Sequence, residues 1–345
     1  MIKKHVIIKS VCFIFVLYQS FLLIKNLLYR TDNGSLENKF DYKLYDGSHY
    51  ANHSNNIIFI ETNAQRIFLT FKQTCSIESA AKNNPDLNIL IFSISAKIKH
   101  ENILTKIYPN IKYYSLNLDE LFNNSYLHYW WFSGVLVTEP HFRSSHLLDA
   151  LRYTLTYKYG GFYSDSDTIT IRNLSPLRQY SAISLLNPNN HEIATGFMHF
   201  TKEHEFLSFF LKRFNLNYKP FDWNSNGPNM IKMSLQLYCN ISTLEPLVLK
   251  IEKIKTYKKL NENEICNLFL LPNEVSYPYH YNEANILFDD LNLLDISKFI
   301  DTYSIHFYGF LTENFSLKKN QRNIYEHFAS LNCPVSYNYF YLSLS

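Results

Sequence analysis

The chain has 345 residues, of which 46% are hydrophobic and 18% charged, a balance that excludes a disordered or collagen-like protein. Lysine and arginine together number 33 against 30 acidic residues, so the composition speaks against a dedicated nucleic-acid-binding protein, and we expect no nucleic-acid partner. Glycine occurs only eight times, and each glycine is therefore expected where the backbone requires one.

The N-terminal segment is strongly apolar. Residues 6–24 contain one charged residue, Lys9, and a helix of this length at about 1.5 Å per residue spans roughly 28 Å, close to a hydrocarbon core. A cleaved signal peptide is the alternative, but no Ala-x-Ala pattern follows the apolar stretch. We therefore predict a cytoplasmic tail (1–5), one N-terminal transmembrane helix acting as a signal anchor (6–24), a polar stem (25–55) and a luminal domain (56–345).

Strands and helices alternate in the predicted luminal domain. Short apolar runs indicate buried strands at 56–61, 87–92 and 111–116. Residues 73–82 and 144–159 have the apolar spacing of helices, and the second helix ends at the pair Gly160-Gly161. This alternation predicts an α/β fold with a mostly parallel central sheet.

Four cysteines follow the predicted anchor. In an oxidising lumen they suggest two disulfides with three possible pairings, and four buried thiols are the alternative. We predict that Cys239 pairs with Cys266, since these two flank one short excursion of the chain. We also predict a bond between Cys75 and Cys333. Asn-x-Ser/Thr sequons are about as frequent as chance produces, and the glycosylation candidates among them are Asn52, Asn123 and Asn314.

Two carboxylates stand at the end of the short strand that follows the glycine pair. Residues i and i+2 of a strand point to the same face, so Asp165 and Asp167 converge on one point. Ligands bind at the carboxyl ends of strands in an α/β sheet, and two carboxylates suit Mn²⁺ or Mg²⁺ with positions left for a diphosphate. Asp149 and Arg152 share a face of the preceding helix near the same place. A bare Asp-x-Asp is more often a solvated turn, but this combination of features favours a site.

The segment from Asp149 to Asp167 resembles the metal-dependent glycosyltransferases that use nucleotide sugars and carry a Gly-Gly-x-Tyr-x-Asp-x-Asp motif. It is most similar to the lactosylceramide 4-alpha-galactosyltransferase and alpha-1,4-N-acetylglucosaminyltransferase family. The resemblance covers nearly the whole predicted luminal part. Its further matches are the strand 56–62, the helix with Cys-Ser-Ile-Glu-Ser-Ala-Ala at 75–81, Gly196-Phe197-Met198, His204-Glu205-Phe206, Asn226-Gly227-Pro228, Tyr277-Pro278, Ile305-His306 and Cys333-Pro334-Val335.

This resemblance implies a GT-A type nucleotide-sugar-binding fold in a single-pass type II protein of the Golgi membrane. It implies a retaining transferase that moves a hexose from a UDP-sugar to a glycosphingolipid or another glycan. The expected hexose is galactose, transferred in alpha-1,4 linkage. Residues 56–173 would form the donor-binding half, with the Asp-x-Asp motif, and 174–345 the acceptor-side half. UDP-GalNAc or UDP-GlcNAc as donor stays open. The mechanism also stays open, although a same-face substitution is preferred because it needs no protein nucleophile.

The family's site residues carry over to matching positions. Asp167 would be the direct metal ligand, Asp165 would face the ribose or sugar of the donor and would reach the metal through water, and both count as catalytic residues. His306 would complete the metal set or contact phosphate, whereas the ordinary alternative is a structural histidine. The residues expected to bind the donor are Asp149, Arg152, Gly160, Gly161, Tyr163, Asn226, Gly227 and His306.

The sequence departs from the family pattern at three places. Thr195 stands where the family has Asn, and Ser164 where it has Leu. After His306 the family shows a hydrophobic residue, Trp and Asn, whereas this chain has Phe307, Tyr308 and Gly309 in a loop expected to cover the metal and the diphosphate. Thr195 and the altered loop motivate an alternative of another class: a catalytically inactive, membrane-tethered protein that binds a glycan or a nucleotide sugar.

Overall fold

The computed structural model describes residues 55–99, 102–138, 142–256, 265–289, 296–313, 315 and 322–343. These residues fall within one compact unit, Lys43–Ser345. The predicted tail and anchor, and the predicted stem up to residue 54, lie outside the described residues. No helix in the described ranges has both the length and the apolar character needed to cross a membrane.

Strands and helices follow one another in the order expected. The strands are β1 (Asn56–Glu61), β2 (Asn88–Ser93), β3 (Ile111–Ser115), β4 (Gly161–Ser164), β5 (Thr168–Thr170), β6 (Ala182–Asn187), β7 (Glu192–Phe200), β8 (Phe269–Leu271) and β9 (Ser304–His306). The α-helices are α2 (Phe71–Asn83), α3 (Asn102–Ile107), α4 (Leu118–Asn123), α5 (His128–Phe132), α6 (Val135–Thr138), α7 (Arg143–Tyr159), α8 (Glu205–Asn217), α9 (Pro228–Cys239), α10 (Ile251–Thr256), α11 (Asn273–Ser276), α12 (Ile324–Asn332) and α13 (Pro334–Ser343).

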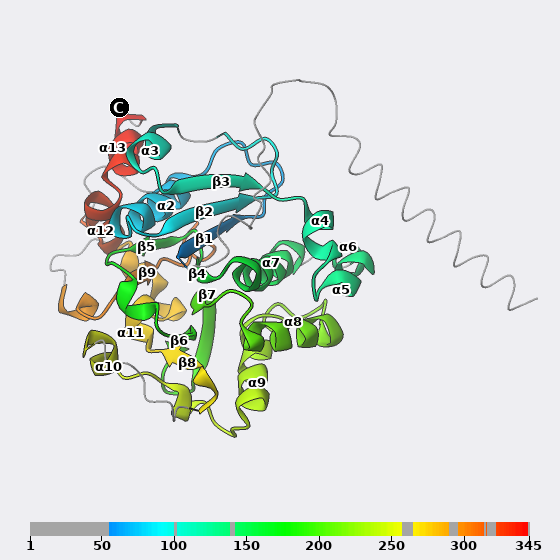
Figure 1. Cartoon of the computed structure of the whole chain (residues 1–345). Coiled ribbons are helices and arrows are strands. Elements are labelled where there is room, and N and C mark those ends of the chain that lie inside the picture. Colours follow the sequence, from blue (N-terminus) through cyan, green and yellow to red (C-terminus); the bar gives the residue numbers. More distant parts are fainter. Residues whose placement is uncertain are drawn as a thin grey trace, which may run out of the picture. The chain divides into compact units, whose positions relative to one another are not determined.

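Among the described residues the main sheet has seven strands in the order β3-β2-β1-β4-β7-β6-β8 (Figure 1). β1 is parallel to both β2 and β4, β2 is parallel to β3, and β6 is parallel to β8. β7 alone runs antiparallel to its neighbours β4 and β6. The predicted α/β fold with a mostly parallel central sheet is therefore confirmed. The carboxyl ends of β1, β2 and β4 lie at one edge, where ligands bind in such sheets.

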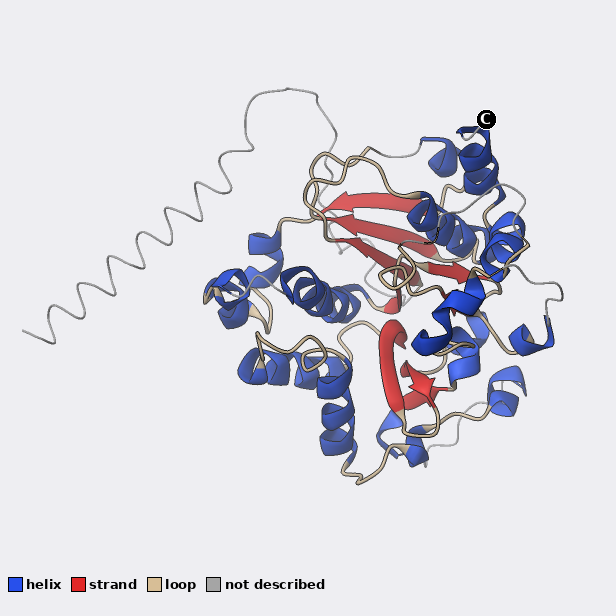
Figure 2. Ribbon diagram, turned by 180° about the vertical axis from the view of Figure 1, so that it is seen from behind, coloured by secondary structure: helices blue, strands red, loops and turns tan. Residues whose placement is uncertain are grey.

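Helices cover both faces of the sheet (Figure 2). Alternate residues of β1 point to opposite faces, so Ile57 and Phe59 pack in the apolar layer that contains α2 and α12. Ile58 and Ile60 pack in the other layer, which contains α7, α8 and α9. The strand predicted at 56–61 is buried on both sides for this reason.

The glycine pair after α7 lets two strands approach closely. Gly160 has φ +67° and Gly161 φ +104°, a conformation that other residues rarely adopt. A Cβ on Gly161 would lie 2.3 Å from the carbonyl oxygen of Asn56. Gly160 caps the end of α7 and Gly161 is the first residue of β4, whereas the carboxylates follow the end of this strand. Gly160 and Gly161 thus pack at the opposite end of the strand from the carboxylates, and the donor contact expected for them stays a prediction.

Two disulfides join distant parts of the described chain. Cys75 in α2 is bonded to Cys333, the residue between α12 and α13, with 5.0 Å between the two Cα atoms. Cys239 at the end of α9 is bonded to Cys266, with 5.2 Å between the Cα atoms. These are the two pairs expected from the sequence.

Candidate active site

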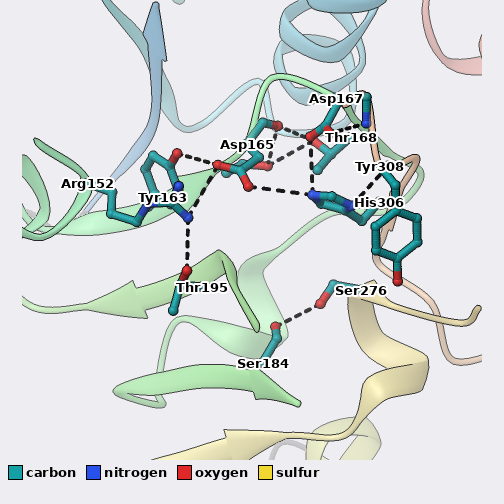
Figure 3. Close-up of polar contacts among 12 residues, drawn as sticks. Arg152, Tyr163, Asp165, Asp167, Thr168, Ser184, Thr195, Ser276, His306 and Tyr308 are labelled. Carbon is teal, nitrogen blue, oxygen red and sulfur yellow. Dashed lines mark hydrogen bonds and ion pairs between the residues drawn. The ribbon is translucent and has the colours of Figure 1, made fainter. Parts of the chain in front are cut away.

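The two carboxylates of the Asp-x-Asp segment lie in the turn between β4 and β5 (Figure 3). Thr168 braces this turn, because its hydroxyl donates a hydrogen bond to the carbonyl oxygen of Asp165 over 3.0 Å. The hydroxyl of Ser164 lies 2.9 Å from that of Thr168. Ser164, where the family has Leu, thus contributes a polar contact to the turn that carries both carboxylates.

His306 reaches the same point from a distant strand. β5 and β9 pair antiparallel with Thr168 opposite His306, which places the imidazole beside the turn. Its Nε2 lies 3.2 Å from Oδ1 of Asp167 and 3.5 Å from Oδ2 of Asp165. One ligand atom from each of the three residues lies within 4.8 Å of the others. The structure therefore brings together the three residues expected to form the metal site.

The hydrogen bonds of His306 define its tautomer. The backbone N–H of Tyr308 donates to Nδ1 of His306 over 3.2 Å, so the ring proton lies on Nε2 and points toward both carboxylates. The rings of His306 and Tyr277 stack with 4.9 Å between their centroids. In this neutral tautomer His306 directs its N–H toward Asp165 and Asp167 but carries no positive charge.

Two glycines approach the carboxylates closely. The backbone N–H of Gly309 donates a hydrogen bond of 2.6 Å to Oδ2 of Asp167. A Cβ added to Gly196 would lie 2.4 Å from Oδ2 of Asp165 and 2.6 Å from the hydroxyl of Tyr277. The backbones of β7 and of the loop after β9 therefore form walls of the site that leave no room for a side chain.

A second polar cluster adjoins the first. Arg152 on α7 lies 3.5 Å from Oδ1 of Asp149, 3.6 Å from Oδ1 of Asp165, and donates a hydrogen bond of 3.0 Å to the hydroxyl of Thr195. Its guanidinium also lies over the ring of Tyr163, 5.0 Å from the centroid, and the Tyr163 hydroxyl donates to Oδ1 of Asp165. Arg152 is thus the residue that joins the helix to the Asp-x-Asp turn.

These contacts give the carboxyl groups of Asp149 and Asp165 different pKa values. Burial raises the pKa of Asp149 to about 6, because the attraction of Arg152 only partly offsets it and Asp165 adds to it. Burial would also raise the pKa of Asp165, but Arg152 and His306 outweigh it and hold this pKa well below its usual range. Burial would lower the pKa of His306, whereas Asp167 and Asp165 raise it above its usual value.

A cavity of about 590 Å³ opens beside the two carboxylates. Its wall includes Tyr163, Asp165 and Asp167 on one side and Gly309 with Glu313 from the loop after β9. Residues at the start of α2 and in the loop before it also line the cavity, as do Ile60 of β1 and Leu148 of α7. The cavity has the size of a small-molecule site and touches the charged groups expected to act on a donor.

The remaining predicted residues lie in different surroundings. Gly227 immediately precedes α9, and a Cβ there would lie 3.0 Å from both carboxylate oxygens of Asp149, so this glycine adjoins the second cluster. The buried amide of Asn226 instead bonds to the backbone N–H and carbonyl of Lys219 and contacts His146, which holds a loop together. The sequon residue Asn123 is exposed at the end of α4, and Asn52 and Asn314 lie outside the described residues.

Two residues of the site have roles that were not expected from the sequence. Thr195 accepts the hydrogen bond from Arg152, although its replacement of Asn suggested only a lost amide contact. Tyr277 stacks on His306, and its hydroxyl, like Oδ2 of Asp165, lies close to Gly196. The sequence feature that pointed to this residue was the Tyr277-Pro278 match to the family, but the match by itself did not indicate what Tyr277 does.

Comparisons with known proteins agree with this site. The family described as "Alpha 1,4-glycosyltransferase conserved region" matches residues 199–340. The family described as "Glycosyltransferase sugar-binding region containing DXD motif" matches residues 70–184, which include Asp165 and Asp167. The first match includes His306 and Gly309.

Curated relatives align over most of the chain. The lactosylceramide 4-alpha-galactosyltransferase of Homo sapiens is 26% identical over 292 residues, which cover 82% of this chain and 76% of the relative. The alpha-1,4-N-acetylglucosaminyltransferase of Homo sapiens is 22% identical over 295 residues, which cover 83% of this chain and 80% of the relative. A solved galactosyltransferase, LgtC with donor and acceptor sugar analogues, aligns over 81% of this chain and 95% of that chain with 12% identity and a TM-score of 0.37.

Proposed function

The chain is a glycosyltransferase of the family that contains the alpha-1,4-galactosyl- and alpha-1,4-N-acetylglucosaminyltransferases, and on this premise we propose which reaction it performs. The proposed reaction transfers a hexose, galactose in alpha-1,4 linkage, from a UDP-sugar to a glycosphingolipid or another glycan with retention at the anomeric carbon. The observation that carries the proposal is the convergence of Asp165, Asp167 and His306 beside a cavity of about 590 Å³.

The donor atoms at this point fit a divalent cation such as Mn²⁺ or Mg²⁺. Oδ1 of Asp167 is buried and lies 3.2 Å from Nε2 of His306, and it accepts no well-formed hydrogen bond from the described residues, so this carboxylate oxygen suits a cation. Asp165 and Asp167 would hold the ion. His306 would join them through an unprotonated Nε2, and the neutral ring would then carry its proton on Nδ1 and no longer accept the hydrogen bond from Tyr308. When bound, the cation would offset the charge of the diphosphate.

The residues around the carboxylates would orient the donor. Arg152 is held by Asp149, Asp165 and Thr195, so its guanidinium has a fixed geometry toward a hydroxylated ligand. In the proposed step an acceptor hydroxyl oxygen forms a bond to the anomeric carbon while the bond from that carbon to the diphosphate oxygen breaks. UDP leaves with the bonding electron pair, and the hydroxyl proton passes to the departing diphosphate.

The proposal includes a place in the cell. We propose the Golgi membrane, with residues 6–24 as the anchor and the domain from residue 56 in the lumen. The apolar character of residues 6–24 supports this location. The two disulfides support it too, because structural disulfides persist in oxidising compartments.

Release of UDP by the purified full chain tests the reaction. We would supply Mn²⁺, lactosylceramide or a short glycan, and in parallel UDP-Gal, UDP-GalNAc, UDP-GlcNAc and UDP-Glc. We expect release with UDP-Gal and its loss in Asp167→Ala. Asp86→Ala is the matched control. Asp86 lies just before β2, at the edge of the sheet opposite the site, and forms an ion pair with Arg178. This variant should keep full activity.

The four donors separate the alternatives. Release with UDP-GalNAc or UDP-GlcNAc alone would keep the transferase and change its sugar. Binding of a donor without release, with every acceptor, would favour the inactive binding protein suggested by Phe307, Tyr308 and Gly309. Release that persists in Asp167→Ala would contradict the role given to the Asp-x-Asp turn.

A further inference from the structure

The cavity beside the carboxylates has a basic residue to which neither the sequence motifs nor the mechanism assign a role. Lys72 lies in the first turn of α2 and lines the cavity together with Asp165 and Asp167. Arg66, from the loop before α2, is the other cationic residue of the wall. The question is whether either side chain is placed to bind the donor.

Arg66 is already paired. Its Nε lies 3.2 Å from Oε2 of Glu61, and the same carboxylate oxygen accepts a hydrogen bond of 2.7 Å from Gln73. The carbonyl oxygen of Arg66 accepts a bond from Ser95. These contacts keep the guanidinium at the end of β1, where its charge is balanced.

Lys72 is held differently. Its Nζ donates a hydrogen bond of 2.9 Å to the carbonyl oxygen of Thr312 and lies 4.8 Å from the centroid of the Phe288 ring. Within the described ranges, no ion pair joins it to a carboxylate. An ammonium has three N–H donors, and the backbone of Thr312 uses one of them. The half-buried Lys72 is therefore positioned without being neutralised.

The contact with Thr312 links Lys72 to the altered loop. This loop follows His306, contains Gly309, and is the segment in which the Trp and Asn of the family are absent. Through Gly309 it also bonds to Asp167. Lys72 and the metal-site carboxylate thus hold the same loop from two sides of the cavity.

The charges of the wall indicate what Lys72 can bind. Burial lowers the pKa of the Lys72 ammonium, and the negative charges of Asp167 and Glu313 only partly offset this effect. A divalent cation held by Asp165 and Asp167 would offset those carboxylates, and the charge of Lys72 would remain for an anion beside the cation. A diphosphate is the anionic group of the proposed donor, and ammonium groups bind phosphate as point charges.

We propose that Lys72 is a donor-binding residue that contacts the diphosphate of the UDP-sugar beneath the loop it holds through Thr312. This inference rests on the proposed function and adds a residue to its site. Lys72 binds the charged part of the donor, so its removal should weaken ligands that contain a diphosphate and leave the nucleoside itself unaffected.

Binding of UDP and of uridine to the full chain with Mn²⁺ tests this role. We would measure UDP by isothermal titration and uridine by ligand-observed NMR for the wild type, Lys72→Met, Lys72→Gln and Lys72→Arg. We expect both neutral variants to bind UDP about 10- to 100-fold more weakly, since a charged hydrogen bond is lost. Uridine binding should not change, and Lys72→Arg should restore most of the affinity for UDP.

Lys82→Met is the matched control. Lys82 lies in the last turn of the same helix, and its Nζ also donates to a backbone carbonyl, that of Leu331, outside the cavity. This variant should bind UDP like the wild type.

The outcomes separate the inference from the function on which it rests. Unchanged UDP binding in the neutral Lys72 variants, or an equal loss for UDP and uridine, would overturn the role of Lys72 alone. A wild type that binds no UDP would overturn the proposed function together with this inference.

Discussion

The acidic residues of the site differ in what their surroundings do to the charged form. Asp149 is 6% exposed and adjoins a glycine, so burial disfavours its carboxylate and raises its pKa to about 6. Asp165 accepts from Tyr163 and lies near both Arg152 and His306, and its pKa is held low although burial acts against it. Two chemically identical side chains on neighbouring elements thus have different protonation behaviour near pH 5 to 6.

The substitution Asp149→Asn should change how stability depends on pH. Folded Asp149 keeps its proton up to about pH 6, whereas its ordinary pKa is 3.8. Between these values the folded chain binds more protons than the unfolded chain, so the contribution of Asp149 to the free energy of unfolding falls as pH rises. The free energy of unfolding of the variant, compared with that of the wild type, should therefore increase by up to roughly 3 kcal/mol as the pH rises from about 4 to about 7.

Urea denaturation at each pH measures this difference. A gap between the two proteins that stays constant over the whole range would contradict the raised pKa.

At the scale of elements, α2 connects the site to the C-terminal helices. Thr70 caps the helix with a reciprocal hydrogen-bond pair to Gln73, and Gln73 also binds Glu61 at the end of β1. Glu78, buried within α2, accepts the backbone N–H groups of Val335 and Ser336. The disulfide from Cys75 to Cys333 fixes the same two regions. The position of Lys72 therefore depends on contacts with β1, near the start of the described residues, and with α13, at their end.

The two disulfides should stabilise the chain by different amounts. Cys75 and Cys333 are 258 residues apart, whereas Cys239 and Cys266 are 27 apart, and a longer closed loop removes more entropy from the unfolded chain. Replacing both cysteines of the first pair by Ser should cost roughly 2 kcal/mol more than the same change in the second pair.

Urea unfolding of the two double variants under identical buffer conditions provides the comparison. An equal loss in both, or the larger loss in the Cys239–Cys266 variant, would refute the predicted order.

At the scale of the whole described chain, the site is assembled from segments that are distant in sequence. Asp167 and Gly309 are 142 residues apart and are joined by a hydrogen bond of 2.6 Å. The β5–β9 pair brings His306 to the Asp-x-Asp turn, and β7 brings Thr195 to Arg152. A cation bound by these residues would link the turn after β4 to the loop after β9.

Divalent cations should therefore stabilise the folded protein. A ligand that binds only the folded state adds about 2.7 kcal/mol when its concentration is 100-fold above its Kd, which corresponds to several degrees in Tm. We expect Mn²⁺ to raise the Tm of the wild type and of Asp86→Asn but not that of Asp167→Asn. A rise of the same size in Asp167→Asn would place the cation elsewhere.

Local sequence was sufficient for features that depend on neighbouring residues. The strand at 56–61 was predicted with its observed bounds, and the helix at 144–159 with a difference of one residue, because apolar periodicity is a local property. Asp165 and Asp167 do converge on one point, but they lie in the turn between β4 and β5, so the strand period from which the sequence predicted this is not its cause. The predicted anchor and stem belong to residues that the structure does not describe, apart from Asn55.

Contacts between distant residues were decided only by the tertiary structure. The sequence assigned the same donor-binding role to Asn226 and Gly227. In the structure Asn226 closes a loop through Lys219, whereas Gly227 packs against Asp149. Lys72 has no motif at all and gains its place through Thr312, on a loop that other strands position. Sequence alone determined which elements form and where the carboxylates stand, because backbone geometry repeats over a few residues. Which side chains share the cavity depended on sheet order and strand pairing, which bring together residues that no local pattern relates.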